Sequence, residues 1–405
     1  MDHQHFHHLN DNREALTQWL KSINKYLIIG MVIGVASIGF SLATQSTRAW
    51  VNILLNHFYF LSLALSGGLI LSIAYVAGGS WIAPIKRFAQ AVSGYIPFAF
   101  VTMIILLFGI HSLYEWSHAD VVAKDELLMK KAPFLNQTWF IIRQFIYFIP
   151  WILITRTLLN KSNMENAHGK DLLSKNYHLV KWACIYLIFF AFSYTLASYD
   201  YLMSLEPHWF STIFAPYHFS GSFVNGLCII TLAAIILEKK GIIKHMTDDN
   251  FHDLAKFIFG FSTFWAYMWL SQFLLIWYAN IPEETAFYHL RMNHSWEKLF
   301  YFNFFINWIT PFFVLIARNA KRSRNVLAAV CVILICGHWL DIYLSTAPAV
   351  YHHHDMHGPS FGLIEIGMFI GFLSLFFKVF FWRLSKKELV AKNDPYFAES
   401  MALHQ

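Results

Sequence analysis

Ten long apolar windows limit what this chain can fold into more than any other feature of it. Each is roughly 20 residues or longer, which at a helical rise of about 1.5 Å per residue is enough to cross a bilayer. The windows cover residues 26–43, 53–78, 94–114, 138–158, 182–203, 212–237, 255–281, 299–317, 326–346 and 361–383. Membrane-spanning β-strands are shorter and alternate in polarity, so the windows predict an all-α integral membrane protein.

The distribution of Lys and Arg predicts how the ten spans are oriented. Of the 30 basic residues, 21 flank one set of span ends and six flank the other. Positive residues are retained in the cytoplasm, so both termini are expected there. The polar N-terminus, residues 1–25, has no small-residue cleavage site and is not expected to be a cleaved signal peptide. The net charge of +6 reflects this topology, and no nucleic-acid partner is expected.

Motifs for bound cofactors are missing from the sequence. Its four cysteines all lie within apolar spans, and no CxxC or CxxCH occurs, which argues against covalent haem and iron–sulfur ligation by this chain. No span carries the matched histidine pairs of a di-haem cytochrome b, and triads, phosphate loops and zinc motifs are absent. No catalytic, cofactor-binding or metal-ligating residue is therefore expected.

Part of the chain is repeated. Asp200 to Pro207 reads DYLMSLEP and Asp341 to Pro348 reads DIYLSTAP, both D-x3-S-x2-P at the outer end of a span. The preceding FIYFIPWILITR and INWITPFFVLIAR also correspond, ending in Arg156 and Arg318. Spans 2 to 5 thus resemble spans 6 to 9, and the pattern predicts two similar four-helix bundles in parallel orientation, with the first and last spans peripheral.

The repeat divides the chain into six parts. They are an N-terminal tail (1–25), a first peripheral helix and loop (26–50), a first bundle (51–211), a second bundle (212–350), a His-rich outer loop with the last helix (351–383) and a C-terminal tail (384–405). Each peripheral helix carries a GxxxG, at Gly30 and Gly34 and at Gly367 and Gly371, which permits close backbone approach. Packing within this chain is the favoured interpretation, and docking on a neighbouring protein chain is the alternative.

Ionisable residues gather at the outer ends of the spans. A charge near the hydrocarbon core costs a few kcal/mol, so such residues are candidates for function, here for a proton path. The candidates are Asp200, Glu206, His208, Glu283, Glu284, His338, Asp341, Glu365, His111 and Glu115. His111, Glu115 and His118 are expected on one helical stripe, as are His338, Asp341 and Ser345. The alternative is that these groups only join helices or lie in interfacial water, and the pattern supports an outer half-channel at most.

Two further groups have structural interpretations. Arg143, early in the fourth span, is costly unless paired, so a structural ion pair with an acid on a neighbouring helix is expected. His352, His353 and His354, with Asp355 and His357, lack fixed ligand spacing, so an adventitious cluster is favoured over a dedicated metal site.

Several long runs carry a family resemblance. WFIIRQFIYFIPW, SYDYLMSLEPHWFSTIF, FHDLAKFIFGFSTFWAYMWLSQFLLIWYANIPEET, GHWLDIYL, and FGLIEIGMFIGFLSLFF followed by LVAKNDPYFAESMALH resemble the ActF family, membrane proteins of bacterial alternative complex III, a quinol:cytochrome c oxidoreductase. The resemblance covers most of the chain from about residue 50 onward. The ActF family is similar in turn to the NrfD/PsrC membrane anchors of iron–sulfur molybdoenzyme-like complexes.

The resemblance implies a ten-span, two-bundle protein of the bacterial inner membrane without a redox cofactor of its own. Its implied partners are a paralogous NrfD-like membrane protein that holds the quinol site, an iron–sulfur protein, multihaem cytochromes c, lipids and a terminal oxidase. Haem c and iron–sulfur clusters would lie in those partners, with menaquinol or another quinol as substrate. Proton conduction is implied at Asp200, Glu206, His208, Glu283, Glu284, Asp341 and Glu365.

Three alternatives remain open. The chain could itself bind quinone, with Asp200 and His208 near the quinol and the electron acceptor in a partner protein. It could be a stand-alone, proton-coupled secondary transporter built on its parallel repeats. It could also be a purely structural anchor whose acids stabilise packing.

Overall fold

The structure, a computed structural model, describes residues 12–162, 170–293, 295–356, 358–391, 394 and 397–402. Residues 1–11 of the N-terminal tail, part of the loop after the fourth span, His294, His357 and parts of the C-terminal tail lie outside these residues. All regular structure in the described part is helical, which confirms the predicted all-α class.

Nine helical segments of the described residues are long and apolar enough to cross a membrane, as expected of a multi-pass membrane protein. They include six long helices: α1 (Arg13–Thr44), α2 (Ser46–Ala77), α8 (Gln137–Ser162), α10 (Phe214–Lys239), α16 (Arg324–His353) and α17 (Leu363–Ser385). The others are Ser80–Leu113, Asn176–Leu205 and Glu297–Leu315. Asn176–Leu205 contains most of α9 (Lys170–Tyr201) and the short η6 (Met203–Leu205).

The tenth predicted window, 255–281, differs from the other nine. It forms α11 (Asp248–Ala279), a helix of 32 residues, but α11 is not among the nine segments apolar enough to span. The physical reason is its composition, since Trp265, Tyr267, Trp269 and Gln272 lower the mean hydropathy of its central turns. Its length and its packing along α10 still make α11 a full member of the helical assembly.

Two spanning segments are interrupted. Ser80–Leu113 comprises η2 (Ser80–Ile85), α3 (Lys86–Val92), η3 (Ser93–Tyr95), α4 (Ile96–Leu106), η4 (Leu107–Gly109) and α5 (Ile110–Leu113). Glu297–Leu315 comprises α13 (Glu297–Phe304), a π-helical turn η7 (Phe305–Ile309) and α14 (Thr310–Leu315). Short helices fill the connections: η5 (Glu115–Ser117), α6 (Ala119–Val122), α7 (Glu126–Lys131), α12 (Pro282–Met292), α15 (Arg318–Arg322) and α18 (Phe397–Ala402).

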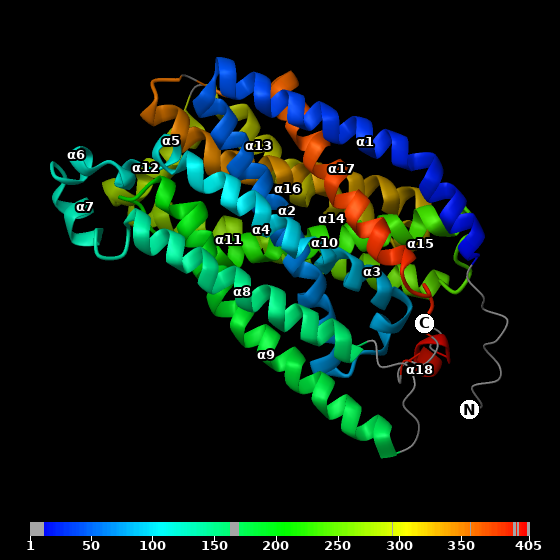
Figure 1. Ribbon diagram of the computed structural model, residues 1–405. Coiled ribbons are helices and arrows are strands. Elements are labelled where there is room, and N and C mark those ends of the chain that lie inside the picture. Colours follow the sequence, from blue (N-terminus) through cyan, green and yellow to red (C-terminus); the bar gives the residue numbers. More distant parts are fainter. Residues whose placement is uncertain are drawn as a thin grey trace.

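The helices α2 and α10 form the centre of the molecule (Figure 1). In their most apolar windows 83% of α2 and 89% of α10 is buried, compared with 17% of α1. A helix that is apolar all round is stable only when other helices surround it, which explains this placement. α2 packs on α4 and α9, α10 packs on α11 and α16, and α2 and α10 contact each other.

The peripheral helices α1 and α17 pack against each other along their GxxxG sequences. A Cβ placed on Gly34 would lie 2.4 Å from the Cα of Gly371, and one on Gly367 would lie 2.1 Å from the Oγ of Ser37. Only glycine leaves room for these contacts, so the two sequences serve packing within the chain.

Replacing Gly371 by Leu is expected to separate α1 from α17. An overpacked side chain typically costs about 1–3 kcal/mol, so the midpoint of thermal unfolding in mild detergent should fall by several degrees. Gly39→Leu on α1 is the matched control, because a Cβ at Gly39 meets no atom within 4 Å. Equal midpoints for the two variants would contradict the proposed close packing.

Candidate functional site

Asp341 on α16 is a buried carboxylate surrounded by neutral hydrogen-bond donors. The hydroxyl of Tyr217 on α10 donates to Oδ1, as does the Nδ2 of Asn303 on α13 at 2.8 Å. The indole Nε1 of Trp265 on α11 donates to Oδ2 at 3.2 Å. None of the three donors is cationic, and a buried carboxylate without a cation binds a proton more readily than one that has a cation beside it.

Asp200 on α9, the counterpart of Asp341 in the first repeat, has a cation beside it. The guanidinium of Arg143 on α8 donates through Nε to Oδ2 and through Nη2 to Oδ1, both at 2.8 Å, and the hydroxyl of Tyr147 adds a bond of 2.9 Å to Oδ2. This bidentate geometry stabilises the ionised carboxylate. Arg143 therefore forms a buried ion pair with Asp200, and the two related aspartates lie in different electrostatic environments.

A π-helical turn accounts for the different hydrogen-bond donors beside Asp341 and Asp200. Arg143 precedes Pro150 by seven residues, whereas Asn303 precedes Pro311 by eight. The π-helical turn η7 lies between Asn303 and Pro311, and a π-turn accommodates one extra residue in a helix. Asn303 thus takes the place in the second repeat that Arg143 holds in the first, and an amide replaces the guanidinium.

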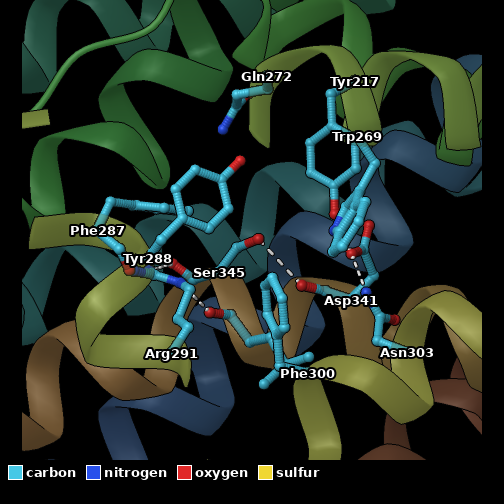
Figure 2. A pocket seen from close by; sticks show the side chains of 11 residues that line it. Tyr217, Trp269, Gln272, Phe287, Tyr288, Arg291, Phe300, Asn303, Asp341 and Ser345 are labelled. Atoms are coloured by element: carbon cyan, nitrogen blue, oxygen red, sulfur yellow. Dashed lines mark hydrogen bonds between the residues drawn. The ribbon is translucent and has the colours of Figure 1, made fainter. Parts of the chain in front are cut away.

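A small cavity adjoins Asp341 (Figure 2). Its volume is about 20 Å³, enough for about one water molecule. Polar groups that line it include Asp341, Asn303, Ser345, Tyr288 and Gln272, whose Oε1 has no hydrogen-bond partner among the described residues. A cavity of this size, with several polar side chains in its lining, has room for a water that bonds to the Asp341 carboxyl.

Arg291 on α12 forms another wall of this cavity (Figure 2). Its Nη2 donates to Oε1 of Glu206 at 2.6 Å, and its Nε donates to the carbonyl of Leu344 at 2.8 Å. Nη1 donates to the carbonyl of Phe287 at 2.9 Å, and the guanidinium lies over the Phe287 ring at 3.4 Å. These contacts hold Arg291 between the cavity at Asp341 and the carboxylate of Glu206.

Glu206 also borders a much larger cavity, at the end of the bundle that the Lys and Arg distribution predicts to face outward. That cavity measures about 1030 Å³, and the side chain of Glu206 is 16% exposed. Lining residues from α12, α16 and the following loop include Thr285, His289, Asn293, His352 and His353. The resulting order, from outside inward, is large cavity, Glu206, Arg291, small cavity and Asp341.

A chain of hydrogen-bonded side chains extends from Asp341 through Asn303 to Asn307. Asn307 in η7 donates from Nδ2 to Oδ1 of Asn303 at 2.7 Å. His338, one turn before Asp341, is buried beside the Trp265 ring, and neither of its ring nitrogens has a hydrogen-bond partner among the described residues.

Glu365, another predicted site residue, lies in a second buried ion pair. Arg48 on α2 donates from Nε to Oε1 at 2.6 Å and from Nη2 to Oε2 at 2.5 Å, and Asn52 adds a bond of 3.0 Å. Glu365 also accepts from the backbone N–H of Gly362 at 2.8 Å, which caps α17. These contacts join α17 to the central helix α2.

The remaining candidates lie at the outer surface. His208 is 2.7 Å from Asp125, and its side chain is 55% exposed. Glu115 is 2.6 Å from His353, and the hydrogen bond from that histidine lowers the pKa of Glu115. Two more acids, Glu283 and Glu284, occupy the first turn of α12, where the helix dipole favours negative charge.

The predicted stripe of His111, Glu115 and His118 on one helix is wrong. α5 ends at Leu113, and Tyr114 is extended. The chain bends there because Tyr114 and Trp116 are buried, their side chains donating to the carbonyls of Tyr201 and Ser204 at 3.0 and 3.1 Å. His111 is left exposed, with Nδ1 3.1 Å from the Ser117 hydroxyl.

Two buried histidines on the central helices α2 and α10 were missed by the sequence reasoning. His57 on α2 lies 2.8 Å from the Thr102 hydroxyl, and His218 on α10 lies 3.5 Å from the Ser345 hydroxyl. Both are followed by Phe, and they are 161 residues apart in the sequence, the same separation as between Pro150 and Pro311. Extending the repeat to α2 and α10 would have found them.

The fold and this site define a class: an all-helical, multi-pass membrane protein with a buried carboxylate beside a small cavity. No protein-family model matches the chain, and no curated protein sequence matches it.

Proposed function

We propose that this chain is a proton-conducting membrane component of a quinol:cytochrome c oxidoreductase of the alternative complex III type, with Asp341 as its buried proton acceptor. The observation that carries the proton-conducting role is the environment of Asp341, a buried carboxylate with neutral donors beside a water-sized cavity. Glu206 and Arg291 connect that cavity with the large outer one. Asp200 belongs to the scaffold in this proposal, because Arg143 neutralises it.

We further propose that the helices form two similar four-helix bundles. One bundle comprises α2, Ser80–Leu113, α8 and α9, and the other comprises α10, α11, Glu297–Leu315 and α16. The contacts of α9 with α2 and α8, and of α10 with α11 and α16, support this grouping. After duplication, one copy would have kept an ion pair for stability while the other kept an uncompensated carboxylate for proton transfer.

The Lys and Arg distribution supports a direction for the route. The excess of basic residues at the inner span ends would place both termini in the cytoplasm of a bacterial inner membrane and the large cavity at the periplasmic surface. Protons would then pass between the periplasm and Asp341 by an outer half-channel. Haem c, iron–sulfur clusters and the quinol would be held by partner proteins against the exposed apolar faces of this chain.

Purification in mild detergent tests membership of the complex. Multihaem cytochromes c and an iron–sulfur protein are expected to co-purify with a tagged form of this chain. A lone, cofactor-free particle would exclude the complex and leave a stand-alone transporter as the interpretation. Labelling of this chain by a photoreactive quinol analogue would instead favour a quinone-binding role.

Replacing Glu206 by Gln tests the outer route. The substitution removes the carboxylate that links the outer cavity to Arg291, and loss of one proton-relay group is expected to lower proton-coupled turnover about tenfold or more. Turnover and proton release are measured with the complex in vesicles. Glu126→Gln is the matched control, since Glu126 is an outer-surface acid with an 80% exposed side chain. Equal turnover in both variants would show that protons do not pass Glu206.

A further inference from the structure

A third cavity lies at the opposite end of the molecule from the outer cavity, where α3 and η3 meet α17 near α8. Its volume is about 430 Å³. Four basic residues line it: Arg87, Arg156, Arg383 and Lys387. None of its described lining residues is acidic. A concave site lined by one sign of charge concentrates ions of the opposite sign.

The cationic lining is built into the fold. Arg87 is buried, and its Nη1 donates to Oε1 of Gln90 at 3.0 Å while its Nε donates to the carbonyl of Glu388 at 3.0 Å. Gln90 donates in turn to the hydroxyl of Ser162 on α8 at 2.9 Å. The hydrogen bonds from α3 to α8 and to the segment after α17 therefore fix the guanidinium at the cavity.

Three of the four cations have no acidic partner among the residues that the structure describes. Asp394 lies 2.6 Å from Lys86, outside the cavity lining. Arg156, Arg383 and Lys387 have no acidic side chain within 4.0 Å in the described part of the chain. Burial, together with the charges of Arg87 and Lys86, lowers the pKa of Lys387 to about 8, as expected for an ammonium group among other cations.

Part of the remaining lining of the cavity is apolar and lies on two helices with exposed apolar side chains. Ile96, Pro97, Ile152 and Leu159 line it, on the helices α4 and α8. The neighbouring side chains of Phe98, Val101, Ile149 and Leu153 are exposed apolar residues on the same two helices. The cavity therefore joins a cationic patch at the span ends to a surface suited to acyl chains, a combination that a free inorganic ion does not require.

We propose that this cavity binds the phosphate of an anionic phospholipid, with Arg87, Arg156, Arg383 and Lys387 around the headgroup and the acyl chains along α4 and α8. Basic pockets between helices at the cytoplasmic surface are suited to such headgroups. Gly94 contributes by its size, because a Cβ there would lie 2.6 Å from Cγ of Arg383. The side chain of Arg383 thus passes over Gly94. This proposal does not depend on the redox partners of the chain.

The test compares lipid binding by the full-length protein and by R383Q/K387Q. Purified, delipidated protein is titrated with phosphatidylglycerol or with phosphatidylcholine in detergent micelles, and binding is followed by native mass spectrometry and thermal unfolding. Wild type should prefer phosphatidylglycerol, and affinity for it should fall about tenfold or more in the variant, since each basic residue near the surface contributes appreciably to anionic-lipid binding. K21Q/K25Q, which removes two exposed charges from α1, should bind like wild type.

A further variant and a further ligand distinguish the possible results. G94A keeps all four charges but displaces Arg383, and it should also weaken binding of phosphatidylglycerol. Equal binding by R383Q/K387Q and K21Q/K25Q would overturn the proposal. Equal stabilisation of wild type by inorganic phosphate and by phosphatidylglycerol would overturn the lipid assignment in favour of a soluble anion. The variants are compared only where their thermal midpoints without lipid match that of wild type, and G94A provides the test if R383Q/K387Q fails to fold.

Discussion

Asp341→Asn is expected to abolish proton-coupled turnover while leaving the fold intact. The amide has nearly the shape of the carboxylate but cannot take up a proton, and loss of a proton-transfer group typically costs about 10²–10⁴-fold in rate. No cation would be left unpaired, because the neighbours of Asp341 are Tyr217, Asn303 and Trp265. Quinol-driven proton release by the reconstituted complex provides the rate, and thermal unfolding provides the stability.

The control for this variant is Ser345→Ala, one helical turn away on α16. Its hydroxyl donates to the carbonyl of Asp341 at 3.0 Å and lines the same cavity, but it carries no titratable proton. Turnover should fall far less than in Asp341→Asn. Full proton release by Asp341→Asn would remove Asp341 from the route and favour the purely structural interpretation of the buried acids.

Arg143→Ala is expected to cause a large loss of stability. It leaves Asp200 buried without its cation, and removal of one partner from a buried ion pair typically costs about 3–5 kcal/mol. The equivalent change in the second repeat, Asn303→Ala, removes a neutral hydrogen bond and should cost only about 1–2 kcal/mol. Unfolding of both variants is followed in the same detergent.

A double variant completes this comparison. Arg143→Met with Asp200→Leu removes both charges, and apolar replacement of a whole buried pair is often close to neutral. It should therefore recover most of the stability lost in Arg143→Ala. If Arg143→Ala were no less stable than Asn303→Ala, the assignment of Asp200 to the scaffold and Asp341 to proton transfer would lose its physical basis.

The all-helical class and the Asp200/Asp341 repeat could be predicted from the sequence because both depend on local patterns. Runs of about 20 apolar residues predict spans by length alone. The prediction had less success with α11, whose aromatic and amide side chains lower its hydropathy, and with His111, Glu115 and His118, where burial of Tyr114 and Trp116 overrides the helical spacing.

The residues of the candidate site could be predicted from the sequence, but their partners could not. Asp200 and Asp341 have the same surrounding motif, and Glu365 also lies at the outer end of a span. The sequence offered no sign that Arg48 would pair with Glu365, 317 residues away, or that Arg291 would lie between Glu206 and Asp341. Such long-range pairs depend on how the helices pack.

By itself, the sequence determined that this chain forms a bundle of membrane helices with a repeated aspartate, since backbone hydrogen bonds in a bilayer must be satisfied within each helix. Only the tertiary structure decided how the two aspartates differ. The π-helical turn η7 places Asn303 beside Asp341, whereas the regular helix α8 places Arg143 beside Asp200. The electrostatic environment of a carboxylate is set by donors from other helices, and their identity emerges only when those helices pack together.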